Sequence, residues 1–190
     1  MESTFFVNKI CFFFDSLFFM IQTKKRMLSN YSDDDEEIDI SYNRLTQLPD
    51  LSRFKNLKRF YCNHNQLTSL PPLTSTLQTL DCYHNQLTHL PSLPSTLQKL
   101  ICSTNQLIHL PPLPSTLQIL VCSDNPLTHL PSLPSTLQGL YCLDNQLTRL
   151  PPFPSTLQVL YCRNNKLTLL PPLPSTLQIN TFNVEGNGGK

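Results

Sequence analysis

Residues 77–96 read LQTLDCYHNQLTHLPSLPST, and closely similar stretches of twenty residues follow without a break as far as residue 176. These are five copies of one unit, each beginning with a leucine that we number position 1. An earlier copy starts at Leu57. More divergent copies at the two ends match through Ile38, Ile40, Asn43 and Leu45, and then through Ile179, Phe182, Val184 and Asn187. A fixed period of this length predicts a solenoid whose units pack on their neighbours.

The first half of each copy has the pattern of a short strand. Positions 4 and 6, such as Leu80 and Cys82, are apolar and alternate with variable residues, so each copy is expected to add one parallel strand with one buried face. Position 9 is asparagine in every well-formed copy. A carboxamide both donates and accepts, so stacked asparagines can satisfy backbone groups left unpaired where the chain turns. This ladder comprises Asn65, Asn85, Asn105, Asn125, Asn145 and Asn165.

The returning half of each copy carries two or three prolines, as in residues 107–114. Proline removes a backbone donor and fixes φ, so no α-helix is expected there and an extended, polyproline-like segment remains. Each copy has about six apolar positions and cannot bury them alone. Stability must therefore come from the stacking of neighbours.

Six of the seven cysteines occupy position 6, at 62, 82, 102, 122, 142 and 162. Because Ile40 fills the same position in the first copy, we interpret the thiols as small buried hydrophobes rather than metal ligands. Side chains stacked in register project in parallel, which suits the torsion of a disulfide poorly. Unpaired thiols indicate a reducing compartment, and we expect a cytoplasmic protein.

The charge balance argues against a nucleic-acid partner. The chain has a net charge of +1, and residues 38–190 hold ten bases and six acids. These bases are scattered, whereas a nucleic-acid binder concentrates them in a stripe with interleaved aromatics. His89, His109 and His129 share position 13 without an accompanying carboxylate, so no metal site, cofactor or catalytic constellation is expected.

The copies differ mainly at positions 3, 5, 7 and 8, which alternate with the buried positions or follow them. They are expected to line the concave face and to form a mixed surface with aromatic anchors around an apolar middle, as a protein interface requires. The alternative is a solvated sheet face whose aromatics merely suit strands. The candidate partner-binding residues are Arg59, Tyr61, His64, Asp81, Tyr83, His84, Lys99, Ile101, Val121, Asp124, Tyr141, Asp144, Tyr161 and Arg163.

The run L-P-x-L-P-S-T-L-Q-x-L-x-C-x-x-N-x-L-T resembles the 20-residue leucine-rich repeats of effectors that some bacterial pathogens inject into host cells. The resemblance covers about residues 38–187. It implies a leucine-rich repeat solenoid of the α/β-repeat class, here mostly β, with a short parallel sheet on the concave face and an extended, proline-rich convex side. In that family the repeats are a recognition module, which implies a site of action in the host cytosol.

Some members of that family carry a separate C-terminal ubiquitin ligase domain with a catalytic cysteine, and no segment of this sequence matches it. We therefore expect a non-enzymatic scaffold that binds a protein partner on its concave face. Two alternatives remain open. One is an effector related to these ligases whose catalytic domain lies elsewhere, and the other is a membrane-tethered, receptor-like module.

The sequence ahead of the repeats predicts two further segments. Residues 1–27 form an apolar leader, in which residues 5–21 are interpreted as a capping helix, a membrane-associated segment, a disordered segment or the product of a misassigned start. Residues 28–37 are interpreted as an acidic linker, because five consecutive acids begin at Asp33. Residues 38–190 form the predicted repeat domain, with seven to eight repeats.

Overall fold

The computed structural model describes residues 28–178 and 182–183, and the chain divides into two units, Met1–Ser32 and Asp33–Lys190. The leader, including the segment 5–21 expected to cap the solenoid or to touch a membrane, lies outside the described residues. No helix in the described part of the chain is long and apolar enough to cross a membrane.

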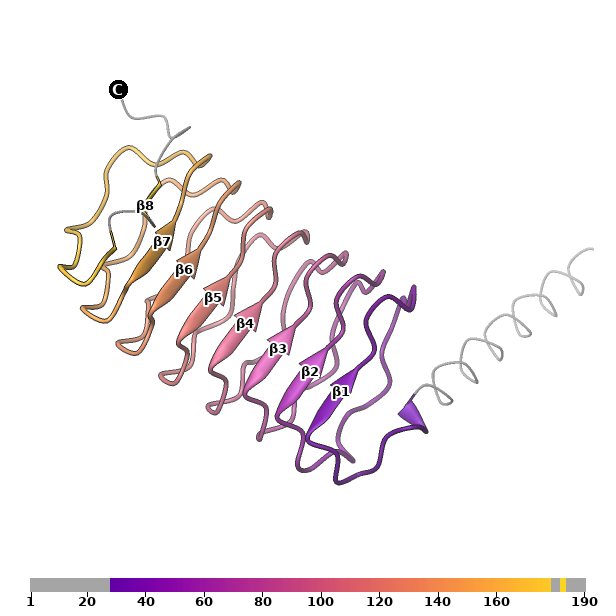
Figure 1. Cartoon of the computed structure of the whole chain (residues 1–190). Coiled ribbons are helices and arrows are strands. Elements are labelled where there is room, and N and C mark those ends of the chain that lie inside the picture. The colour runs from indigo at the N-terminus through magenta and orange to yellow at the C-terminus, as the bar shows by residue number, and fades with distance from the viewer. Residues whose placement is uncertain (1–27, 179–181, 184–190) are drawn as a thin grey trace, which may run out of the picture. The chain divides into compact units, whose positions relative to one another are not determined.

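The second unit is a solenoid with one short strand per coil (Figure 1). The strands are β1 (Glu37–Asp39), β2 (Arg59–Tyr61), β3 (Thr79–Asp81), β4 (Lys99–Ile101), β5 (Ile119–Val121), β6 (Gly139–Tyr141), β7 (Val159–Tyr161) and β8 (Phe182–Asn183). They form one parallel sheet in chain order. The register advances by 20 residues from β2 to β7, whereas Glu37 pairs with Arg59, so the first coil is two residues longer. The expected solenoid, mostly β and with a parallel sheet, is confirmed.

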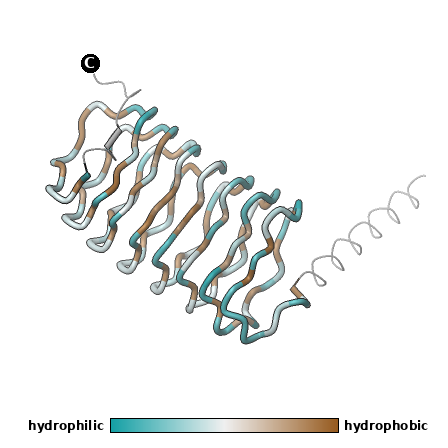
Figure 2. Tube along the Cα trace, in the orientation of Figure 1, coloured by the Kyte–Doolittle hydropathy of each residue, from teal (hydrophilic) through white to brown (hydrophobic). Residues whose placement is uncertain are grey.

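The core consists of columns of identical positions that run through the coils. The middle residue of strands β1 to β7 is buried, and so are the leucines at positions 1 and 11. Figure 2 shows the resulting hydrophobic bands at the same place on successive coils. Phe60 places a larger ring at the middle of β2, and Phe54 adds a second ring from the return segment of the first coil; both are fully buried. Each coil therefore completes its core with the coils on either side.

The proline-containing return segments are extended, as expected. Residues 71–74, 91–94 and their counterparts have no regular secondary structure, and each ends in a turn, such as the bond from Leu97 N–H to the Pro94 carbonyl at 3.1 Å. The leucine before the proline pair or proline–serine step, such as Leu110, is buried in the coils from Leu70 to Leu150 and half-buried at Leu170. The return path is therefore a thin extended wall held to the core by its leucines.

The asparagine ladder is present, and its hydrogen bonds show why a carboxamide is required. Asn145 Oδ1 accepts the N–H of Leu127 in the preceding coil at 3.1 Å. Its Nδ2 donates to the carbonyls of Cys122, Cys142 and Leu143 at 3.1, 3.3 and 2.9 Å. Asn65, Asn85, Asn105, Asn125 and Asn165 repeat this pattern. Asn43, in the divergent first coil, is exposed and donates to the Ser41 carbonyl instead.

A second ladder is formed by the threonine that ends each copy. Thr136 Oγ1 donates to the Ser115 carbonyl at 2.7 Å and lies 2.8 Å from the Leu117 carbonyl, 21 and 19 residues earlier at the equivalent turn one coil back. The equivalent threonines are Thr76, Thr96, Thr116, Thr156 and Thr176. The recurring Ser-Thr pairs lie in turns. The threonine hydroxyls also join successive coils, because each one reaches carbonyls of the equivalent turn one coil earlier.

We expect Thr136→Val to lower the free energy of unfolding by about 1 kcal/mol, because valine keeps the β-branched shape but removes the donor to the preceding coil. Thr148→Val is the matched control, since Thr148 is exposed. Its loss should stay within about 0.5 kcal/mol. Equal losses in urea denaturation would show that the threonine ladder adds nothing to stability.

The acidic run is largely exposed, and its last residue begins the first strand. Glu37 begins β1, and the Glu36 carbonyl accepts the N–H groups of Lys58 and Arg59 at 2.8 and 2.9 Å. The carboxylates of this run pair with bases of the next coil in three ion pairs, Asp33–Arg53 at 2.6 Å, Glu36–Lys58 at 2.5 Å and Glu37–Arg59 at 2.5 Å. Residues 33–37 therefore belong to the first coil, and their charges match the bases that lie 20 to 22 positions later.

Candidate functional site

The strand residues among the candidates lie on one face of the sheet. Positions 3 and 5 flank the buried position 4 and are half-buried in β2 to β5 and β7, so they point away from the core. Because the strands β2 to β7 pair in parallel with a constant register, the residues at position 3 form one column and those at position 5 form another. This face carries Arg59, Tyr61, Asp81, Lys99, Ile101, Val121, Tyr141 and Tyr161. The remaining six candidates, His64, Tyr83, His84, Asp124, Asp144 and Arg163, follow the strands.

Position 8 has a backbone constraint that sequence analysis did not recognise. It adopts the left-handed conformation in every coil, with φ between 51° and 58° at Tyr42, His64, His84, Thr104, Asp124, Asp144 and Asn164. Apart from glycine, Asn, Asp and His are the residues enriched in this region. The recurrence of His, Asp and Asn at position 8 was therefore a signal of backbone shape as well as of surface chemistry. Each of these side chains is carried on a turn just beyond its strand.

Aromatic rings cluster at the N-terminal end of the solenoid. The ring centroids of Tyr42 and His64 are 4.3 Å apart at an interplanar angle of 13°, which is a stacked arrangement. His64 also meets Tyr83 edge-on at 5.0 Å and His84 at 4.8 Å. Tyr42 is 72% exposed, so one side of this cluster remains open to solvent. His64, Tyr83 and His84 are among the predicted candidates, whereas Tyr42, at position 8 of the divergent first coil, is not, because the candidates begin with the second copy.

A second aromatic pair lies near the C-terminal end of the sheet. The rings of Tyr141 and Tyr161 stack with centroids 5.3 Å apart and planes 14° from parallel. Gly139 precedes Tyr141 on the same strand face, and a Cβ there would lie 3.2 Å from Cε2 of Tyr141. The tyrosine ring therefore leans over a glycine. Ile101, Ile119 and Val121 form the half-buried apolar middle between the two aromatic groups.

The charges of the candidate residues are distributed unevenly along the solenoid. Arg59 is paired with Glu37, and this contact raises the pKa of its guanidinium. Burial raises the pKa of the Asp81 carboxyl, although its Oδ1 accepts the Tyr83 N–H. Burial also raises the pKa of Asp124, and the Asp144 carboxylate in the next coil adds to this shift. Asp144 itself accepts a bond from Asn164 Nδ2 at 2.8 Å. Position 8 thus changes from histidine to aspartate along the axis.

The cysteines at position 6 are buried free thiols, as expected. Burial raises the pKa of each of them, to about 12 at Cys122 and about 11 at Cys162. The thiolate is the nucleophilic form, so these groups are unreactive in the folded chain at neutral pH. Among the described residues, no group of three or more His, Cys, Asp or Glu side chains could hold a metal ion.

We expect a thiol reagent to label Cys62, Cys82, Cys102, Cys122, Cys142 and Cys162 only when the chain unfolds. Folding raises the pKa values of these thiols, so their neutral form favours the folded state. This stabilisation is complete below about pH 8.5, the pKa of a cysteine thiol in the unfolded chain. This stabilisation should be lost progressively as the pH rises from there toward about 12, the value at Cys122. Labelling should follow the unfolding transition in urea and quicken above pH 8.5. Rapid stoichiometric labelling of the native protein at pH 7 would contradict a buried column.

The described coils define a solenoid with a parallel sheet on one side and extended return segments on the other, which is the architecture of a leucine-rich repeat interaction scaffold. Family comparison agrees with this class. Residues 36–75 match the family described as Leucine Rich repeats (2 copies), and residues 76–97 and 156–177 match the family described as Leucine Rich Repeat. No curated protein shows a significant match to the chain.

Three solved structures of bacterial leucine-rich repeat proteins are similar to the chain. YopM from Yersinia enterocolitica WA-314 is 38% identical with a TM-score of 0.75, and the match covers 77% of this chain and 32% of that one. A Shigella effector LRR domain is 32% identical with a TM-score of 0.68, covering 80% and 67%. YopM from Yersinia pestis is 31% identical with a TM-score of 0.63, covering 75% and 46%.

The chain belongs to the leucine-rich repeat family, in the form with 20-residue periodicity that bacterial effector proteins contain. This confirms the resemblance seen in the sequence. The chain spans about a third to a half of the length of the two YopM structures.

Proposed function

We propose that this protein is a non-enzymatic scaffold that binds a protein partner on the concave sheet face. The observation that carries the proposal is the stacked pair Tyr141 and Tyr161, half-exposed beside an apolar middle of Ile101 and Val121. Binding energy in protein interfaces concentrates in a few aromatic and arginine anchors that are surrounded by contacts of lesser energy. Rigid rings already stacked in the free protein lose little conformational entropy on binding.

The polar surroundings support the same surface. Asp124, Asp144 and Arg163 are exposed at the turns next to the tyrosines, and they supply the charged rim that a typical interface has around its apolar centre. The sheet itself is rigid, because every strand from β2 to β7 is paired on both sides. The six buried free thiols fit action in a reducing compartment such as the cytosol.

Affinity capture with the full chain as bait tests the proposal. Immobilised wild-type chain and the double variant Tyr141→Ala with Tyr161→Ala are exposed in parallel to host cytosol, and bound proteins are identified by mass spectrometry. A partner retained by the wild type and lost from the tyrosine variant supports the sheet face as the interface. A partner retained equally by both places the interface elsewhere, and the double variant His109→Ala with His129→Ala controls for a general surface effect.

A further inference from the structure

A groove at the N-terminal end of the solenoid lies just beyond the carboxyl ends of β1, β2 and β3, away from the tyrosine pair. Its volume is about 510 Å³, within the usual range for ligand sites of about 300 to 1,000 Å³. It is lined by Tyr42, Arg44, His64, Asn65, Gln66, His84, Asn85 and Gln86. These residues come from three successive coils, so the groove runs along the solenoid axis.

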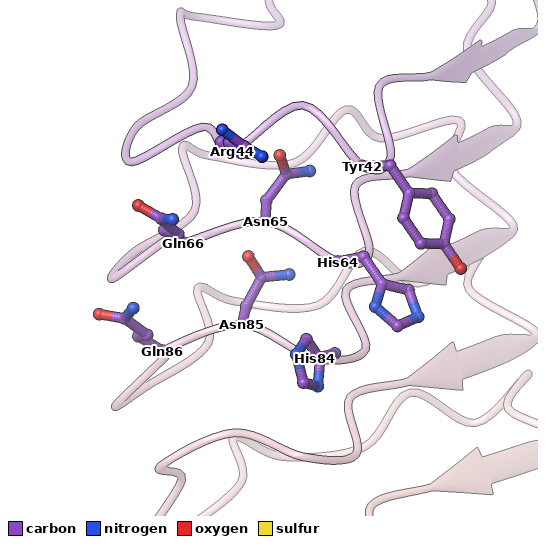
Figure 3. A pocket seen from close by; sticks show the side chains of 8 residues that line it. All are labelled: Tyr42, Arg44, His64, Asn65, Gln66, His84, Asn85 and Gln86. Carbon is purple, nitrogen blue, oxygen red and sulfur yellow. The ribbon is translucent and has the colours of Figure 1, made fainter.

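Figure 3 shows how the two walls differ. The rings of Tyr42, His64 and His84 stand in a row on the side of the strands, whereas Arg44 and the two glutamines form a row on the opposite side. The ladder residues Asn65 and Asn85 lie between the rows. One wall is therefore aromatic, and the other carries a guanidinium and two carboxamides.

The backbone holds these walls in place. Tyr42, His64 and His84 occupy position 8, where the backbone is left-handed. Among the described residues, the first coil has a second left-handed residue, Arg44, with a φ of 54°. The hydrogen-bonding groups of the ladder are already engaged, since Asn65 Oδ1 accepts from Asn43 and Leu45 and its Nδ2 contacts three carbonyls. A ligand would therefore be bound by the side walls and not by the floor.

The lining of the groove contains one basic side chain, Arg44, and no acidic one. Arg44 is exposed and forms no ion pair in the described part of the chain, and no carboxylate lines the groove. The nearby carboxylates are on strands, where Asp39 and Asp81 each accept a backbone N–H two residues later. A guanidinium binds a carboxylate through two parallel hydrogen bonds, and imidazole and carboxamide groups supply further donors.

We propose that this groove binds a short acidic segment of a partner protein in an extended conformation. Three coils at the usual strand spacing extend over about 10 Å, which is the length of about three extended residues. In this arrangement Arg44 binds an aspartate or glutamate side chain, and Gln66 and Gln86 can pair with peptide N–H and C=O groups. The rings of Tyr42, His64 and His84 then cover a side chain that neighbours the acidic residue in the bound segment. The inference rests on the proposed function in one respect, that the partner is a protein.

The groove and the tyrosine pair can be tested separately, because four strand spacings, about 19 Å, separate β2 from β6. The test uses a random hexapeptide library on phage, selected against the full chain. The best binder is then synthesised with a fluorescein label and titrated by fluorescence anisotropy. The variant for the groove is Arg44→Asn with His64→Asn, because asparagine accepts the left-handed conformation and should preserve the fold. The matched control is Arg149→Asn with His89→Asn, two exposed residues outside the groove.

Selected peptides should contain adjacent Asp or Glu residues, and the best one should bind the groove variant at least tenfold more weakly than the wild type or the control. Replacing its acids with Asn or Gln should cause a similar loss, whereas Tyr141→Ala with Tyr161→Ala should leave its affinity unchanged. The proposal is overturned if no peptide binds, if the selected peptides are not acidic, or if the groove variant binds as the wild type does. Tighter binding of a single-stranded oligonucleotide to the groove would also overturn it. Failure of the tyrosine test would remove the sheet-face proposal and leave this result standing.

Discussion

Replacing Tyr141 and Tyr161 together with alanine should weaken binding of a captured partner by at least about 2 kcal/mol, which is close to a thirtyfold increase in Kd. The two rings stack at 5.3 Å and are half-exposed, so they present a rigid apolar surface to a partner. Their contribution to folding is smaller. Loss of an aromatic pair on a surface should lower the free energy of unfolding by about 1 kcal/mol.

Calorimetry with the purified partner and thermal melting of the same samples would separate these two effects. The double variant His109→Ala with His129→Ala alters exposed side chains at position 13 and should change neither quantity. If the tyrosine variant retains full affinity, the interface does not include this end of the sheet. If the loss of affinity is accompanied by a large drop in melting temperature, the tyrosines have a structural role.

The largest stability effect is expected at the ladder. Asn145 is 3% exposed and its side chain satisfies one N–H and three carbonyls in two coils. We expect Asn145→Ala to lower the free energy of unfolding by about 1 to 3 kcal/mol, because these buried backbone groups lose their partners. Asn145→Asp should cost more, since a carboxylate can accept from Leu127 N–H but cannot donate to the carbonyls, and it introduces a buried charge.

Gln146→Ala is the adjacent control for this prediction. The Gln146 side chain is exposed, and the bond from its backbone N–H to the Leu127 carbonyl at 2.9 Å survives the substitution. Its stability should stay within about 0.5 kcal/mol of the wild type in chemical denaturation. A loss equal to that of Asn145→Ala would mean that the ladder position has been misassigned by one residue.

Features that recur in every copy could be predicted from this one sequence. The buried strand centre, the cysteine column and the asparagine ladder each repeat at a fixed spacing, so copies of the unit act as an internal comparison in which invariant positions indicate shared structural demands. The closeness of Tyr141 and Tyr161 is also a consequence of the repeat, because equal positions in adjacent coils must lie about one strand spacing apart, whereas the stacked geometry comes from the structure.

What the repeat could not show is how particular residues meet across neighbouring coils. The left-handed turn at position 8 and the Thr136 hydroxyl bonded to the preceding coil have local sequence signals, but their roles depend on which carbonyls and rings the next coil presents. The ion pair between Glu37 and Arg59 joins a divergent coil to a regular one through a step of 22 residues. The groove beside Arg44 arises in the same way. Periodic burial is encoded in each copy, whereas these contacts exist only after stacking brings non-equivalent side chains together.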